Sequence, residues 1–277
     1  KPVAVGGGPA GMEAARVAAT AGHKVVLMEA SADLGGLINV ARRAPKLHVI
    51  GDYVTWQESE IYRLGVDVRL NNYAEADDVL AESPDAVIVA TGSMPRLDGV
   101  QTVRPAIPAR GVELPHVLSS VDLLTDSRRN LGKTALLFDD VGHYEAVAAA
   151  EYLVTQGVDV TFATRFPSFA PLMETTLRND PAMQRLLAGP GKFRLMNRMF
   201  LKEIREGEAD LQPLQGEQVE TVKADTVVLV FDRDALRSLY DDLFQRVGYC
   251  AVVGDAESPK DLQVAVREGH LAARAIA

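Results

Sequence analysis

Cysteine is almost absent from this sequence, which has one, Cys250, among 277 residues. A single cysteine cannot form an intramolecular disulfide, a Cys-x-x-Cys redox pair or an iron–sulfur site by itself. We therefore expect a cytoplasmic protein. Any redox chemistry must then come from a bound cofactor.

Basic residues are also scarce: 29 Lys and Arg stand against 38 Asp and Glu, a net charge of −9. Nucleic-acid binding depends on clustered basic residues, so no nucleic-acid partner is expected. No segment approaches the ~20 consecutive apolar residues of a membrane-spanning helix. No signal peptide stands ahead of the first motif either, and no membrane association is expected.

What the sequence does contain is typical of a globular chain, with 47% hydrophobic and 24% charged residues. Residues 3–5 predict a short strand, 12–19 a helix and 24–28 a second strand, the order of a βαβ unit in a parallel sheet. A second unit of this kind begins with a strand at 134–138 and a helix at 144–155. The predicted fold class is α/β, with two Rossmann-like dinucleotide-binding domains, the second inserted into the first.

The turn of the first unit reads Gly6-x-Gly8-x-x-Gly11. In a dinucleotide fingerprint the first glycine makes the tight turn, the second lets the backbone approach the pyrophosphate, and the third lets helix and strand pack closely. The N-terminus of the following helix offers free N–H groups to a diphosphate. Glu29, at the end of the second strand, can accept hydrogen bonds from both ribose hydroxyls and repels a 2′-phosphate. The alternative, a turn whose glycines serve packing only, leaves this acid unexplained.

Further motifs resemble those of a known family. Flavoproteins with two dinucleotide folds share the glycine turn, Glu29 and three further segments: Leu34-Gly35-Gly36, Ala90-Thr91-Gly92 and Gly254-Asp255-Ala256. With residues 138–146 and 258–263, the pattern is most similar to the C-terminal FAD/NAD(P)-binding half of the old-yellow-enzyme-like NADH:flavin oxidoreductases. That group contains dienoyl-CoA reductase, trimethylamine dehydrogenase and histamine dehydrogenase, and the resemblance covers nearly the whole chain.

In that family this half follows a TIM-barrel domain that holds FMN and a cysteine-ligated iron–sulfur cluster. This sequence contains neither the barrel nor the cysteines. The resemblance therefore implies a piece of a longer enzyme, or a separate subunit, that works with such a barrel in cis or in trans. It also implies an electron-transfer flavoprotein as a possible acceptor and a homo-oligomeric full-length enzyme.

The resemblance implies an FAD site, or an ADP site, because both ligands share the pyrophosphate turn. The turn and the start of its helix would face the pyrophosphate, Glu29 the adenosine ribose, and Gly36 the flavin side. Asp255 would bind the ribityl chain, and the helix opening near Leu262 would point its N-terminus at the flavin. The implied cofactor-binding residues are Gly6, Gly8, Pro9, Ala10, Gly11, Glu29, Gly36, Thr91, Gly92, Gly254, Asp255 and Leu262. A turn-forming role for Asp255 and a plain strand exit at Thr91 stay open.

The second unit lacks the glycine pattern. Aligning the two helices by Glu13 and Glu145 places three polar residues opposite Gly7, Gly8 and Gly11: Asp139, Asp140 and His143. Two carboxylates there would repel a diphosphate, each by about 1 kcal/mol or more, so NAD(P) is not expected at this site. Arg165 could meet a 2′-phosphate but is more often a surface ion-pair partner.

Residues 1–107 plus 236–277 are the predicted FAD(ADP)-binding domain, because the Gly-Asp-Ala strand and the last helix should return to complete the site. Residues 108–235 are the predicted NAD(P)-binding-like domain with a degenerate turn. The predicted function is a flavin-dependent oxidoreductase module that relays electrons between a partner flavin or cluster and an acceptor. The alternatives are a structural ADP-binding domain and an NAD(P)H-dependent flavin reductase. No catalytic residue is assigned, and the histidines lack metal-ligand spacing, so no metal is expected.

Overall fold

The computed structural model describes residues 1–276, which form two compact units. Unit 1 consists of Lys1–Arg42, His48–Met94 and the C-terminal segment from Arg233. Unit 2 consists of Arg43–Leu47 and Pro95–Asp232. The predicted domain division, residues 1–107 plus 236–277 and residues 108–235, stays a prediction.

Unit 1 is built on a five-stranded parallel sheet in the order β15–β4–β1–β2–β3. Its strands are β1 (Pro2–Val5), β2 (Val26–Met28), β3 (Asp67–Arg69), β4 (Ala86–Val89) and β15 (Tyr249–Val252). The three central strands are buried along their whole length and are almost entirely apolar. Such strands need cover on both faces of the sheet.

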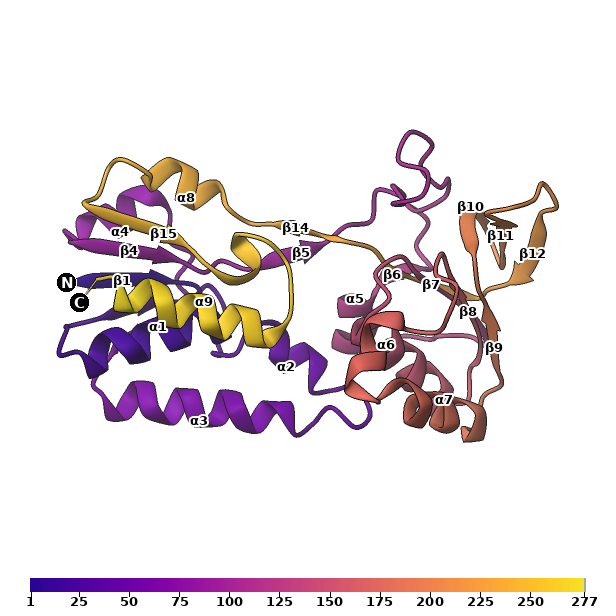
Figure 1. The fold of residues 1–277 in the computed structure, drawn as a ribbon, viewed down its shortest axis with the longest axis horizontal. Helices are drawn as coiled ribbons and strands as arrows, with labels where there is room; N and C mark the ends of the chain where they lie inside the picture. Colours follow the sequence, from indigo (N-terminus) through magenta and orange to yellow (C-terminus); the bar gives the residue numbers. More distant parts are fainter. Residues whose placement is uncertain (277) are drawn as a thin grey trace. The chain divides into compact units, whose positions relative to one another are not determined.

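Helices supply that cover, with three on one face and two on the other (Figure 1). The first face carries α1 (Pro9–Thr20), α3 (Ile50–Arg63) and α9 (Leu262–Arg274), and the second carries α4 (Ala76–Ala81) and α8 (Ser238–Leu243). The short helix α2 (Leu37–Ala41) follows the β2 loop, and β5 (Ser93–Pro95) pairs with β14 (Arg233–Ala235).

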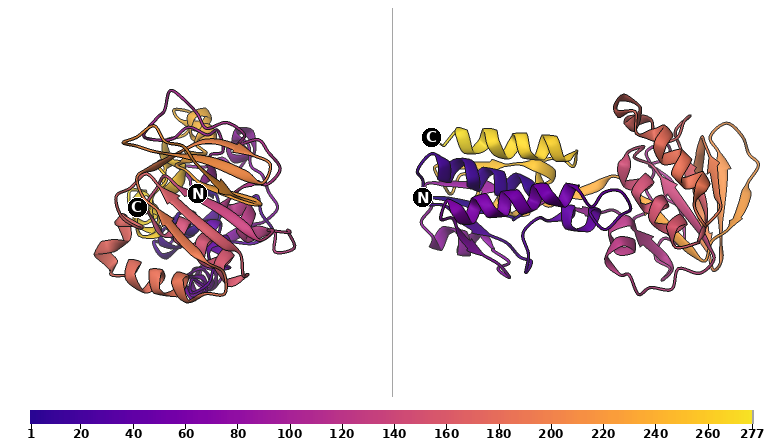
Figure 2. Two further views of the ribbon diagram at one scale, coloured as in Figure 1. Left: turned by 90° about the vertical axis from the view of Figure 1, so that its right-hand side faces the viewer. Right: turned by 90° about the horizontal axis from the view of Figure 1, so that it is seen from below.

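Small residues bring the last helix against the first, and α1 and α9 lie side by side (Figure 2). A Cβ added at Gly269 would lie 2.1 Å from the carbonyl oxygen of Ala10. A Cβ added at Gly254 would lie 2.9 Å from the Cβ of Ala10. The backbone of α9 therefore packs on the start of α1, the helix that follows the first glycine turn.

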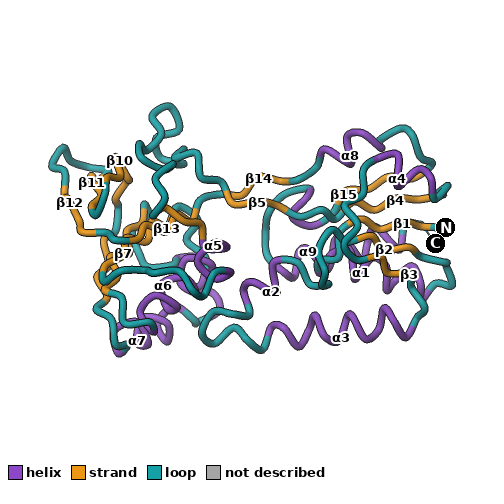
Figure 3. Tube along the Cα trace, turned by 180° about the vertical axis from the view of Figure 1, so that it is seen from behind, coloured by secondary structure: helices purple, strands orange, loops and turns teal. Residues whose placement is uncertain are grey.

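Unit 2 also contains a five-stranded parallel sheet, in the order β6–β13–β7–β8–β9. These strands are β6 (Val117–Ser119), β7 (Thr134–Asp139), β8 (Asp159–Thr164), β9 (Phe193–Met196) and β13 (Thr226–Val230). Helices cover one face, and a three-stranded antiparallel sheet covers the other (Figure 3). The covering elements are α5 (Ser120–Thr125), α6 (Tyr144–Thr155), η1 (Pro171–Thr176), α7 (Asn179–Ala188), β10 (Met199–Arg205), β11 (Glu208–Pro213) and β12 (Glu220–Lys223).

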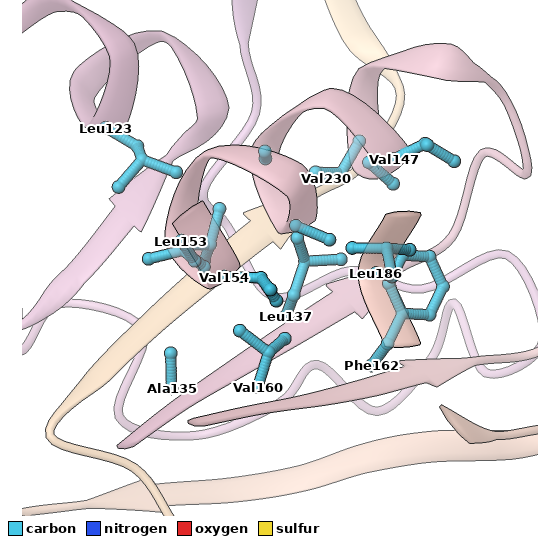
Figure 4. Close-up of a cluster of buried hydrophobic side chains, with 14 of the residues drawn as sticks. Leu123, Ala135, Leu137, Val147, Leu153, Val154, Val160, Phe162, Leu186 and Val230 are labelled. Atoms are coloured by element: carbon cyan, nitrogen blue, oxygen red, sulfur yellow. The ribbon is translucent and has the colours of Figure 1, made fainter. Parts of the chain in front are cut away.

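The core of unit 2 lies between α6 and strands β7 and β8 (Figure 4). Leu137 and Phe162 point from the sheet toward Leu153 and Val154 of the helix, and all four are almost fully buried. Burying each such side chain contributes about 1.5–3 kcal/mol. Alanines on α6 let its backbone approach the sheet. The predicted α/β class with two Rossmann-like parallel sheets is confirmed.

Candidate functional site

The carboxyl ends of four adjacent strands meet at one edge of the unit 1 sheet. Gly6 follows β1, Glu29 follows β2, Thr91 lies just beyond β4, and Gly254 lies just beyond β15. Ligands of open parallel α/β sheets bind at this edge. The structure thus gathers four separate segments of the predicted site.

The first turn, residues 6–8, excludes side chains where it meets its neighbours and is open where a ligand would approach. A Cβ added at Gly6, whose φ is +105°, would lie 2.2 Å from the carbonyl oxygen of Ala90. A Cβ added at Gly11 would lie 1.9 Å from the carbonyl oxygen of Gly6. At Gly8, by contrast, no atom lies within 4 Å of an added Cβ.

Gly8 is also the N-cap of α1 and provides no side-chain cap. The first N–H groups of a helix have no partner inside the helix, and Pro9 has no N–H to satisfy. The first turn of α1 carries no acidic residue, so nothing on the helix itself neutralises the positive end of its dipole. A diphosphate fits this combination of free N–H groups, positive potential and open backbone.

Glu29 is 9% exposed and holds the first turn against the end of β2. Its Oε2 accepts a hydrogen bond from the Gly7 backbone N–H at 2.5 Å, and its Oε1 accepts one from the Ser31 N–H at 2.6 Å. Each carboxylate oxygen has a further lone pair to accept a hydrogen bond from a hydroxyl. The acid therefore lies where a ribose beside the turn would need it.

Gly36 is exposed and touches the same turn from the loop after β2. Its φ of +52° favours glycine, and an added Cβ would lie 3.2 Å from the Cα of Gly8. The neighbouring Gly35 N–H donates to the Gly7 carbonyl at 2.8 Å. The side chain of Leu34 fills the space beside Gly7, because a Cβ there would lie 2.5 Å from its Cδ2.

Asp255 lies at the β15 end of the edge and is bound by the protein itself. Its Oδ2 accepts from Ser93 Oγ at 3.0 Å, and its Oδ1 accepts from the Lys260 N–H at 3.3 Å. Arg233 Nε donates to the same Ser93 hydroxyl at 3.0 Å. Sequence analysis did not identify Ser93 and Arg233, because neither belongs to a recognised motif and the two lie far apart along the chain.

Thr91 and Leu262 have local structural roles at this edge. Thr91 Oγ1 donates to the Leu236 carbonyl and so ties the β4 exit to the segment after β14. Leu262 is half-buried at the first position of α9, whose N-cap Asp261 accepts from the Val264 N–H at 2.8 Å. Unlike α1, α9 therefore carries its own side-chain cap.

Glu13, which the sequence did not single out as a site residue, is a buried acid between α1 and α9. Its oxygens accept hydrogen bonds from Arg16 at 2.7 and 2.9 Å, and His270 Nδ1 lies 3.0 Å from Oε1. Burial raises the pKa of Glu13, but the hydrogen bonds from Arg16 and His270 outweigh it and hold the pKa below the usual value. Glu13 thus links α9 to α1 about one helical turn beyond the start of α1.

The second turn, residues 140–143, differs from the alignment that the sequence predicts. In the sheets, Val5 is the last β1 residue paired with β2, and Asp139 is the last β7 residue paired with β8. Asp139 therefore occupies the place of Val5, and Asp140 that of Gly6. The predicted positions opposite Gly7 and Gly8 are wrong, because Glu13 is the fifth residue of α1 whereas Glu145 is the second residue of α6. His143, expected opposite Gly11, is the N-cap of α6, the place that Gly8 holds in α1.

Among residues 1–276, no group of three or more His, Cys, Asp or Glu side chains is arranged to hold a metal ion. Within the same residues, no helix is long and apolar enough to cross a membrane.

Comparison with known proteins identifies relatives of this chain. Residues 3–70 match the family model of FAD dependent oxidoreductases. The chain is 40% identical over 171 residues to a probable N-methylproline demethylase of Rhizobium meliloti, covering 62% of this chain and 24% of that protein. It is 29% identical over 309 residues to dimethylamine dehydrogenase of a Hyphomicrobium species, covering 98% of this chain and 41% of that enzyme.

The solved structure of histamine dehydrogenase from Rhizobium sp. 4-9 superposes with a TM-score of 0.90 at 28% identity, over 99% of this chain and 43% of that one. Other relatives are named as dehydrogenases, reductases and an oxidase. The resemblance to the trimethylamine-dehydrogenase-like group is confirmed. The chain spans less than half the length of these relatives.

Proposed function

We propose that this chain, an FAD-dependent oxidoreductase relative of dimethylamine and histamine dehydrogenases, is the FAD-binding module of such an enzyme. In this proposal its FAD relays electrons between a flavin or iron–sulfur centre on a partner domain and an acceptor. The observation that carries the proposal is the uncapped N-terminus of α1, with Gly8 open to a ligand.

In this proposal, different residues at the carboxyl edge of the unit 1 sheet bind different parts of FAD. Gly6, Gly8 and the N–H groups of Ala10 and Gly11 would bind the pyrophosphate. Glu29 would accept hydrogen bonds from the adenosine ribose while it keeps its contact with Gly7. When bound, FAD supplies an isoalloxazine that accepts and returns electrons, chemistry that no side chain of this protein provides.

The flavin end of the site would be formed by the loop after β2 and by the segments that follow β4 and β15. Gly36 would leave room beside the turn, and Thr91 and Gly92 would line the β4 exit. Asp255 would exchange its contact with Ser93 for a ribityl hydroxyl. The N-terminus of α9, which begins at Leu262, would face the ring.

The length of the relatives supports a partner domain, since this chain spans 24–43% of them. We propose a TIM barrel with FMN and an iron–sulfur cluster as that domain, in cis or in trans. An electron-transfer flavoprotein is the proposed acceptor, and the complete enzyme is proposed to be a homo-oligomer. A cytoplasmic location stays a prediction of the cysteine-poor sequence.

Two alternatives use the same fold. ADP without a flavin would satisfy the pyrophosphate turn and Glu29 equally well and would make unit 1 a structural nucleotide domain. An NAD(P)H-dependent flavin reductase needs a second turn that is open to a nucleotide. The support for this alternative is that relatives of the chain are named as a bilirubin reductase and an NADH oxidase.

The absorption spectrum of the purified protein, with chromatography of the nucleotide released on denaturation, tests the proposal. Flavin absorption with FAD in the extract supports the redox module. A colourless protein that releases ADP supports the structural alternative. A colourless, nucleotide-free protein that does not take up added FAD contradicts the proposed function.

A further inference from the structure

Two N–H groups of the second turn, those of Val141 and Gly142, are already bound to a carboxylate of the protein. Asp139 Oδ1 accepts hydrogen bonds from the Val141 N–H at 3.0 Å and from the Gly142 N–H at 2.8 Å. Thr164 Oγ1 donates to the Asp139 backbone carbonyl at 2.9 Å and lies 3.3 Å from Oδ2. The side chain of Asp139 is fully buried. In the first turn Val5 occupies this place and offers no side-chain acceptor, and the Gly7 N–H is bound instead by Glu29 from the end of β2.

The side chain of Asp140 is also bound by other residues of the protein. Its Oδ2 accepts from the Thr102 N–H at 2.8 Å and from the Thr102 hydroxyl at 2.7 Å. Arg165 Nε lies 2.9 Å from Asp140 Oδ1 and donates to the Asp140 backbone carbonyl at 2.9 Å. Arg165, the residue suited to a 2′-phosphate, is therefore paired with the turn itself, and Thr102 fixes the preceding loop to it.

The following segment covers the second turn. A Cβ added at Gly142 would lie 2.6 Å from a ring carbon of Phe166. The Leu172 N–H donates to the Gly142 carbonyl at 3.1 Å. The guanidinium of Arg165 lies 4.0 Å from the centroid of the Phe166 ring. The space beside Gly142 is thus filled by the Phe166 ring, as Leu34 fills the space beside Gly7 in the first turn.

We infer that Asp139 is a built-in anionic ligand of the second turn, and that unit 2 is closed to NADH and NADPH. An anion tethered to the chain competes with free nucleotide at a high effective concentration, and a diphosphate would also have to displace a buried charge. Asp140, Arg165 and Phe166 complete the closure. Unit 2 then contributes structure without holding a second dinucleotide.

Direct binding tests the closure. With the first site saturated by FAD, or by ADP if FAD does not bind, the protein is titrated calorimetrically with NADH and with NADPH. Dinucleotide enzymes use KM values of about 1 μM to 1 mM, so no binding up to about 1 mM is expected. Saturable micromolar binding of either nucleotide would overturn the inference, and it would leave the FAD proposal intact.

Amide hydrogen exchange tests the role of Asp139. Asp139→Asn keeps an oxygen acceptor for both N–H groups, whereas Asp139→Ala removes it. The Val141 and Gly142 amides are expected to exchange at least about tenfold faster in the alanine variant than in the asparagine variant. Asp241→Asn, at an exposed ion pair, is the control and should match the unmodified protein. Equal protection in all variants would show that Asp139 is not the ligand. The titration decides the closure even if the alanine variant does not fold.

Discussion

Glu13 of α1 and His270 of α9 lie 3.0 Å apart, Oε1 to Nδ1, although 257 residues separate them along the chain. The same carboxylate receives two hydrogen bonds from Arg16. This contact joins the helix that follows the first turn to the last helix among the described residues. A buried acid thus adds hydrogen bonds to the close packing of small residues that brings the two helices together.

Glu13→Gln is expected to lower the free energy of unfolding at neutral pH by roughly 1–3 kcal/mol, because Arg16 and His270 lose a charged acceptor. The pKa of Glu13 is lowered in the folded protein, so its contribution is present above the unfolded-state value of 4.5. It is lost as pH falls through the folded-state value. Urea unfolding at pH 7 and at successively lower pH measures both effects. The difference between the two proteins should shrink on acidification, and a constant difference would contradict the charge-based account.

Gly8→Glu is expected to weaken FAD binding by about a hundredfold or more while the fold persists. Its φ of −74° suits any residue, and its added side chain meets only open space, so the new carboxylate projects where the diphosphate would lie. Fluorescence titration with FAD measures the affinity, and thermal unfolding without nucleotide confirms the fold. Gly8→Ala is the matched variant and should lose much less. If the glutamate variant bound FAD with full affinity, the assignment of the FAD site to this turn would be contradicted.

Glu29→Gln is expected to weaken binding of FAD and of ADP to the same extent, by roughly 10–100-fold. The charged acceptor for the ribose hydroxyls is worth about 1.5–3 kcal/mol more than no bond, and both ligands share that ribose. Binding of each ligand by calorimetry gives the comparison. A loss for FAD alone would place Glu29 at the flavin instead of the adenosine.

The raised pKa of Asp139 predicts that the free energy of unfolding depends on pH in an unusual direction for a carboxyl group. Burial raises its pKa to about 6 from an ordinary value of 3.8, even though the Gly142 and Val141 N–H groups favour the charged form. Because the folded-state pKa is raised, the protonated carboxyl stabilises the folded protein fully below about pH 4, and this stabilisation is lost as pH rises through about 6. The expected change is on the order of 1–3 kcal/mol.

Asp139→Asn should remove this component, so the unfolding free energy of the variant should vary less between pH 4.5 and pH 7. Chemical denaturation of both proteins across that range makes the comparison. Identical pH profiles would mean that Asp139 does not titrate in the folded protein as described.

The first turn was predictable because its motif is contiguous in the sequence, and Gly11 meets Gly6 within one βαβ unit, although Gly6 itself meets Ala90 beyond β4. The position of Glu29 at the same edge follows from the parallel order of β1 and β2. The partners of Asp255 were not predictable, since Ser93 lies 162 residues away and carries no motif. The second turn was misaligned because its anchors, Glu13 and Glu145, lie at different positions in their helices, the fifth of α1 and the second of α6. The strand pairing of Asp139 with Thr164 and the helix N-cap at His143 reveal the correct alignment.

The discontinuity of unit 1 sets the order in which its site can form. Strands β1, β2 and β4 leave the ribosome first, then Pro95–Asp232 of unit 2, and only afterwards β15 and α9. Until those last elements arrive, β4 lacks one neighbour, and α1 lacks the helix that packs on Ala10. Binding of the proposed nucleotide would therefore be a late event in biosynthesis, and a chain interrupted before β15 would carry the glycine turn without the helix that packs on α1.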